Sequence, residues 1–192
     1  MRAEIITRPG ATPKKILSFL ERNLSLVTNY KTVVLHFGIN WLSAKEEWGL
    51  YLKLINQEIS LDQYNKELQD LNPPPATGTA TDFRDQYQQV IEHVQMRNPG
   101  AIILVSSIIP RPWDYQRRHL VCISYNKILK SFNNSSTGIF YIHSFKPFFD
   151  PFQTLKKELF DVDGLHLTKQ GSIVLRAFLC EKIDKAARGL LK

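Results

Sequence analysis

Two ionisable side chains near the carboxyl end of the sequence have a spacing that supports acid–base chemistry. Asp163 and His166 lie three residues apart in the segment Asp-Gly-Leu-His, directly before a predicted helix. In a hydrolase, a carboxylate at this distance orients an imidazole, and the imidazole removes the proton of a serine hydroxyl. The same segment is also typical of a turn in which the aspartate caps a helix and the histidine is incidental. The pair alone does not decide between these interpretations.

Asn40 and Gly10 are candidates for stabilising a negatively charged oxygen. Asn40 follows an apolar run and Gly38, so its amide is expected at the carboxyl end of a sheet, where open α/β folds bind ligands. An N–H group at that place can donate to an oxyanion. Asn40 could equally bond its own backbone in a tight turn, and a glycine after Pro9 is also common in turns. Each residue is a weak signal by itself.

These residues need a scaffold, and the chain alternates predicted strands and helices. The run from Thr32 to Gly38 is nearly continuous apolar sequence, which is typical of a parallel strand covered on both faces. The alternation predicts a three-layer α/β/α sandwich around a parallel sheet. The expected strands cover 3–7, 32–38, 101–109 and 139–143, and the expected helices cover 13–26, 83–97, 119–132 and a long stretch after Thr168.

Capping residues mark several helix boundaries, and one segment interrupts the alternation. Thr12 with Pro13 predicts a helix start, as does Thr168, whereas Asn98-Pro99-Gly100 predicts a stop. We therefore expect one domain over residues 1–192 with an insertion at about 43–81, helical at first and ending in a Pro-rich loop. The insertion is either a lid or a solvated excursion.

Composition limits the class of protein. The chain has 192 residues, of which 43% are hydrophobic and 22% charged, enough for one domain with a real core. It shows no apolar run of membrane-spanning length and no secretory leader, and its two cysteines lie far apart, so we expect a cytoplasmic protein with reduced thiols. The net charge of +7 favours weak association with nucleic acid, although the basic residues are scattered in pairs.

The order of the motifs resembles the SGNH/GDSL-type esterase (hydrolase) superfamily. The shared pattern is strand, Pro9-Gly10, helix, strand, Gly38-Ile39-Asn40, and finally Asp163-Gly164-Leu165-His166 before a helix, with the strand at 102–112 ending in Pro-Arg-Pro. The chain is also similar to the esterase domains in the first open reading frames of some LINE-type retrotransposons. The resemblance covers nearly all of the sequence and implies the SGNH hydrolase fold, with a flavodoxin-like sheet of strand order 2-1-3-4-5.

The resemblance also implies roles for particular residues. Gly10 and Asn40 would form the oxyanion hole, His166 would be the base, and Asp163 would orient it. The family's nucleophile lies in a Gly-Asp-Ser block, and no Gly-Asp-Ser occurs in this sequence. We therefore expect a chain that lacks the first strand and its serine. No cofactor or metal is implied, because a serine hydrolase needs neither.

Other residues depart from the family pattern or receive no chemistry. Trp41 stands where the family usually has aspartate, and it either packs in the core or lines an apolar acyl pocket beside Asn40. His36 and His143 are interpreted as satisfied core or rim histidines. Ser106 and Ser107 are assigned no role, because nothing near them resembles a nucleophile turn.

Two functions follow from the sequence as hypotheses. The first is hydrolysis of a small carboxylic or acetyl ester, with the serine supplied in a longer form of the protein. The second is a non-catalytic interaction module that binds nucleic acid weakly. Serine-dependent hydrolysis distinguishes the first, and binding that weakens steeply with salt distinguishes the second.

Overall fold

The fold is an alternation of helices and parallel strands, seen in a computed structural model that describes residues 11–23, 28–38, 50, 53–54, 56–70, 78–109, 115–161 and 166–191. The expected strand at 3–7 lies outside the described residues. In chain order the elements are α1 (Pro13–Arg22), β1 (Thr32–Leu35), α3 (Leu61–Asp70), α4 (Ala80–Arg97), β2 (Ile102–Ser106), α5 (Tyr115–Ser131), η3 (Ser135–Thr137), β3 (Ile139–Ile142), η4 (Lys146–Phe148), η5 (Lys157–Leu159) and α6 (Lys169–Ala187).

The described strands form one parallel sheet in the order β1-β2-β3. Thr32 is opposite Ile102 at the start of β1, and Ile103 is opposite Ile139 at the start of β3. All three strands therefore end at the same edge of the sheet. Sequential neighbours of this kind match the later strands of the flavodoxin-like order expected from the sequence, and they confirm the predicted parallel α/β class.

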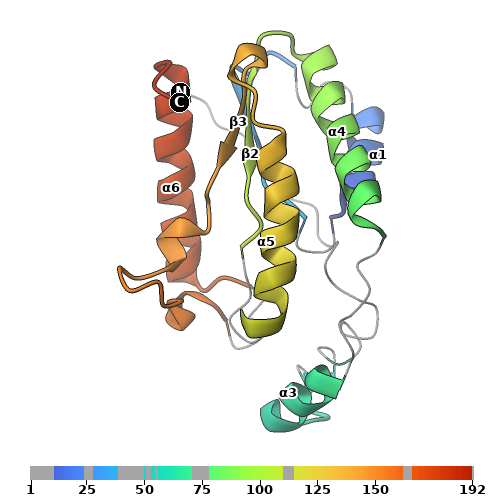
Figure 1. The fold of residues 1–192 in the computed structure, drawn as a ribbon, viewed down its shortest axis with the longest axis vertical. Helices are drawn as coiled ribbons and strands as arrows, with labels where there is room; N and C mark the ends of the chain where they lie inside the picture. The colour runs from blue at the N-terminus through green and yellow to red at the C-terminus, as the bar shows by residue number, and fades with distance from the viewer. Residues whose placement is uncertain are drawn as a thin grey trace.

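Helices cover both faces of the sheet (Figure 1). One face carries α6, and the other carries α4 and α5, with α1 lying against α4. The arrangement confirms the predicted three-layer sandwich. Among the described helices of the sandwich the layers are unequal, because α1, α4 and α5 lie on one side and α6 lies on the other.

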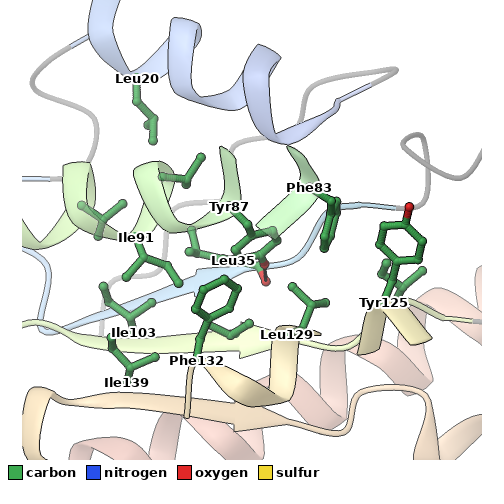
Figure 2. Packing of buried hydrophobic residues seen from close by; sticks show 14 of the residues in the cluster. Leu20, Leu35, Phe83, Tyr87, Ile91, Ile103, Tyr125, Leu129, Phe132 and Ile139 are labelled. Atoms are coloured by element: carbon green, nitrogen blue, oxygen red, sulfur yellow. Dashed lines mark hydrogen bonds between the residues drawn. The ribbon is translucent and has the colours of Figure 1, made fainter. Parts of the chain in front are cut away.

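The main hydrophobic core lies between the sheet and the side of α1, α4 and α5. Figure 2 shows that Tyr87 and Ile91 of α4 point toward Leu35, Ile103 and the side chains of α5. Tyr87 is fully buried, stacks on Phe37 with 4.6 Å between ring centroids, and donates its hydroxyl to the carbonyl oxygen of Leu35 at 3.2 Å. This tyrosine therefore fixes α4 to the carboxyl end of β1.

The strand β1 is less buried than its apolar sequence predicts. Only Leu35 is buried, whereas Thr32, Val33 and Val34 are half-buried. The strand is still covered on both faces, as expected, because Val33 packs against one hydrophobic cluster and Val34 packs against another. Its partial exposure follows from its position, since β1 pairs with β2 on one side and lies at the edge of the described sheet.

The predicted helix boundaries are confirmed at two amino termini and wrong at one carboxyl terminus. The Thr12 hydroxyl caps α1 with Pro13 in its first turn, and the Thr168 hydroxyl caps α6 by accepting from the Gly171 N–H at 3.1 Å. The first helix ends at Arg22 rather than continuing to residue 26. The backbone of Asn23 leaves helical geometry, and its side chain bonds back to the carbonyl oxygen of Phe19 at 2.8 Å.

The segment interpreted as an insertion contains α3, which stands apart from the sandwich at the lower end of Figure 1. Its expected Pro-rich loop at 71–77 lies outside the described residues. None of the described residues between 43 and 78 belongs to the three hydrophobic clusters of the sandwich. Within the described part of the chain, we find no helix with both the length and the apolarity needed to cross a membrane.

Candidate functional site

The candidate site is the edge of the sheet at which the parallel strands end. His36 follows β1 directly, Ser106 is the last residue of β2, and Ser144 comes two residues after β3. The segments η4 and η5 and the start of α6 lie at this same end, the lower end of the sandwich in Figure 1. Open parallel sheets bind ligands at this edge, because the connecting segments diverge there.

His166 is the only residue of the predicted catalytic and oxyanion set that the structure describes. Its side chain is exposed, and it comes three residues before the first residue of α6. Asp163, Gly10, Asn40 and Trp41 lie outside the described residues. The structure therefore places the candidate base at the expected end of the sheet, and it does not test whether the other four come near it.

The segment that carries the Asp-Gly-Leu-His motif is tied together where it leaves and rejoins the described chain. The Asp161 N–H donates to the carbonyl oxygen of His166 at 2.8 Å, and Phe160 bridges to Leu167. The Thr168 N–H also donates to the carbonyl oxygen of Leu159 at 3.0 Å. These bonds fix the backbone of His166 against η5 and the first turn of α6.

Gly38, the first residue of the Gly-Ile-Asn motif, has a backbone conformation that requires glycine. Its φ is +125°, and it is buried. A Cβ atom there would lie 3.1 Å from Cδ1 of Ile108 and close to the ring of Phe83. Gly38 therefore packs closely against the segment that follows β2, where a larger residue would not fit.

The segment that follows β2 is fixed by a buried amide. The Asn126 side chain of α5 accepts from the Ile108 N–H at 2.7 Å and donates to the Ile108 carbonyl oxygen at 3.0 Å. This pair satisfies both backbone groups of Ile108 where the strand ladder no longer does. The segment around Ile108, against which Gly38 packs, is therefore held in place by α5.

A chain of hydrogen bonds that the sequence interpretation missed connects the three strand ends. His36 Nδ1 lies 2.7 Å from Ser106 Oγ, which lies 2.7 Å from Ser144 Oγ. The Ser144 hydroxyl also donates to the carbonyl oxygen of Ser107 at 2.9 Å, and the Ser107 hydroxyl lies 3.0 Å from Ser144 Oγ. The three serines are buried, with at most 1% of their surface exposed, whereas His36 is exposed at the rim.

The direction of this chain decides whether Ser106 and His36 form a nucleophile and its base. A carbonyl oxygen only accepts, so the single hydroxyl proton of Ser144 points to Ser107, and Ser144 Oγ accepts the proton of Ser106. Ser106 therefore has no proton left for His36, and Nδ1 of His36 is the donor in their bond. Because Ser106 is also fully buried, the pair is not poised for attack on a substrate.

The environment keeps His36 uncharged. Protein atoms crowd the ring although part of the side chain remains exposed, and this loss of solvent lowers the pKa of His36 to about 4. The pKa of His143, the histidine after β3, is also lowered, first by burial and then by Lys130 and Lys146. The interpretation of both as rim histidines agrees with their exposed positions.

The sequence carries one signal for this polar chain of hydrogen bonds. His36, Ser106 and Ser144 each come at or within two residues of an observed strand end, and parallel strands bring such positions together. The predicted strands at 32–38 and 101–109 are too long and conceal this signal, because they place His36, Ser106 and Ser107 inside the sheet. The observed strands end at Leu35 and Ser106.

Comparisons with known proteins place the fold among the GDSL-like lipases. No protein-family model matches the sequence, and no curated protein matches it. Among solved structures, 11 chains match. A protein from Streptococcus pneumonia provisionally described as a platelet activating factor is 18% identical with a TM-score of 0.63, over 90% of this chain and 68% of that one. A GDSL-like lipase from Bacteroides thetaiotaomicron is 16% identical with a TM-score of 0.59, over 92% of this chain and 73% of that one. Identities this low establish the fold alone.

Proposed function

We propose that the chain is an esterase domain of the SGNH/GDSL type that hydrolyses small carboxylic or acetyl esters by acyl transfer through a serine. The nucleophile would come from a Gly-Asp-Ser block, which this 192-residue sequence does not contain. The observation that carries the proposal is the position of His166, exposed at the carboxyl edge of a sheet whose fold is that of a GDSL-like lipase.

In this proposal His166 accepts the serine proton and later gives it to the leaving alcohol. Asp163 orients its ring, and Gly10 and Asn40 donate N–H groups to the oxyanion, as the family pattern implies. The bond from Asp161 to the His166 carbonyl supports the role of the loop, because a base acts only if its backbone is held in place. The positive φ of Gly38 supports a need for glycine at the first position of the Gly-Ile-Asn motif.

The test is hydrolysis of a short-chain p-nitrophenyl ester by two proteins. One is this chain, and the other extends upstream to include a Gly-Asp-Ser block. We expect hydrolysis by the extended form and its loss, by about 10³-fold or more, in His166→Ala. A matched His143→Ala variant removes an imidazole from the end of β3 and is expected to leave hydrolysis within about twofold of the parent. An inactive extended form, or an unaffected His166→Ala, would contradict the proposal.

A second function, weak binding of nucleic acid by a non-catalytic descendant of the family, is favoured by one surface feature. A depression on α1 is lined by Lys14, Lys15 and Arg22 together with Ser18, Phe19 and Asn23. Cations beside an aromatic ring suit a phosphate backbone with its bases. The net charge of +7 adds a general attraction.

Salt dependence separates a localised surface from this general attraction. We expect oligonucleotide affinity to fall with salt and the slope to decrease by about 2 when Lys14, Lys15 and Arg22 are all changed to alanine, at roughly 0.7 per phosphate contact. The control changes Lys127, Lys156 and Lys169 together. Equal slopes in the two triple variants would show that the α1 surface has no special role.

A further inference from the structure

The serine chain leaves one nitrogen of His36, a residue exposed at the rim, as a hydrogen-bond acceptor. Nδ1 donates to Ser106, and the ring is uncharged, so the second nitrogen, Nε2, carries a lone pair and no proton. No described residue donates a hydrogen bond to Nε2. A histidine ring free to rotate in water would exchange between both tautomers, whereas the buried serines select this one.

The acceptor lies where a ligand of this fold would lie. His36 follows β1 at the carboxyl edge, two residues before the buried Gly38 and four before Asn40, to which the family pattern gives an oxyanion contact. The first turn of α6, three residues after His166, begins at this end of the sandwich as well. A substrate bound at this edge is therefore expected to meet Nε2 of His36.

The serines make the acceptor rigid. Ser106 and Ser144 have no exposed surface, so water does not compete for their hydrogen bonds. Ser106 is opposite Ile142 in the ladder between β2 and β3, and Ser144 follows β3 by two residues. A ring held in this way accepts from one direction only.

We propose that Nε2 of His36 is a specificity-determining acceptor that selects esters carrying a hydroxyl group or amide N–H beside the ester. This inference rests on the proposed esterase function and deepens it by naming the substrate class. A ligand without such a donor would cover Nε2 and leave it without a partner, which opposes binding. A metal ion is the other common partner of a neutral imidazole, but the described residues contain no group of three or more ligating side chains.

The first test measures the tautomer and the ligand contact directly, and it needs no nucleophile. In long-range ¹H–¹⁵N spectra of the chain with ¹⁵N-labelled histidine, we expect His36 as the Nδ1–H tautomer, assigned by its absence in His36→Gln. Adding N-(2-hydroxyethyl)-N-methylacetamide should shift the His36 Nε2 signal. Its O-methyl ether has nearly the same shape without the hydroxyl donor and should not.

The second test compares affinities of the same two amides. We expect the wild-type chain to prefer the hydroxyl compound by about two- to tenfold, the range of one net hydrogen bond, and His36→Phe to bind both equally. His143→Phe is the matched control and should keep the preference. An Nε2–H tautomer, equal shifts or no shift with both compounds, or a preference that persists in His36→Phe would overturn the inference.

The outcomes also separate this inference from the proposed function. If the extended form hydrolyses 2-hydroxyethyl acetate and 2-methoxyethyl acetate equally well, the esterase function stands and the role of His36 fails. If the hydroxyl preference in binding is present but no form hydrolyses an ester, the role of His36 as an acceptor stands and the esterase function fails. If His36→Phe does not fold, the wild-type spectra still test the inference, because they report the tautomer of His36 and the shift of its Nε2 signal.

Discussion

At the scale of single residues, His36 makes the stability of the fold depend on pH. Its pKa is lowered from 6.5 to about 4 in the folded chain, so the fold favours the neutral ring. The resulting stabilisation is complete above pH 6.5 and is lost as the pH falls from 6.5 toward 4. We expect the free energy of unfolding in urea to decrease more steeply over this interval for the wild-type chain than for His36→Gln.

The comparison between these two proteins isolates His36, because every other titrating group is present in both. Carboxylates such as Asp82, whose pKa is lowered by its bonds to Thr79, contribute equally to each curve. Parallel curves for wild type and His36→Gln between pH 6.5 and 4 would contradict the prediction.

The serine chain should also contribute to stability at neutral pH. Ser144→Ala removes the acceptor of Ser106 and the donor to the carbonyl oxygen of Ser107, and both partners are buried. Unpaired buried groups of this kind cost about 1–3 kcal/mol, which urea unfolding would measure. Ser172→Ala on the exposed surface of α6 is the control and is expected within about 0.5 kcal/mol of wild type. If Ser144→Ala lowers the free energy of unfolding no more than this control does, the hydrogen bonds of the serines do not stabilise the fold as predicted.

At the scale of elements, the contact between α6 and η5 depends on one glycine. A Cβ atom on Gly171 would lie 2.0 Å from the carbonyl oxygen of Leu159, which is backbone and cannot rotate away. The same carbonyl accepts from Thr168, and the adjacent bridge from Phe160 to Leu167 closes the loop before His166. The absence of a side chain at residue 171 therefore lets the start of α6 hold the candidate base.

Gly171→Ala is consequently expected to destabilise the chain although alanine favours helices. Relief of the clash by separating α6 from η5 costs about 1–3 kcal/mol or more, which exceeds the helix gain of about 1 kcal/mol. In an active extended form, kcat/KM should fall as well, because His166 moves. Gln170→Ala, exposed in the same turn, controls for helix propensity. Unchanged stability and unchanged kcat/KM in Gly171→Ala would show that the contact with η5 is not needed.

The elements also show which parts of the fold the sequence could predict. Thr12 and Thr168 gave two helix starts correctly, because a capping hydroxyl acts on the backbone beside it. Local pattern did not give the ends of α1, β1 and β2, since apolar residues continue beyond them and tertiary position decides where a strand stops pairing. The strand β1 is half-buried because of its place in the sheet order, and hydrophobic periodicity does not predict that order.

At the scale of the whole molecule, the candidate site was predicted unevenly for a related reason. The Asp-Gly-Leu-His and Gly-Ile-Asn motifs are contiguous, so they were visible in the sequence. The chain from His36 through Ser106 to Ser144 joins residues 70 and 38 positions apart and exists only once three strands are aligned. Its members are common residue types, and only the parallel register makes them a unit.

The whole molecule also has a part whose described residues lie outside its three hydrophobic clusters. The described residues between 43 and 78 contribute nothing to the three hydrophobic clusters, and α3 stands apart from the sandwich (Figure 1). Replacing residues 43–78 by a short Gly/Ser linker is expected to change the free energy of unfolding by no more than about 1 kcal/mol, because loop-closure entropy varies slowly with length. Loss of a single cooperative urea transition would show that the segment belongs to the core.

The same replacement in an active extended form decides between the two interpretations of the insertion. Removing a lid changes the ratio of kcat/KM between short and long acyl esters, whereas removing a solvated excursion leaves that ratio unchanged.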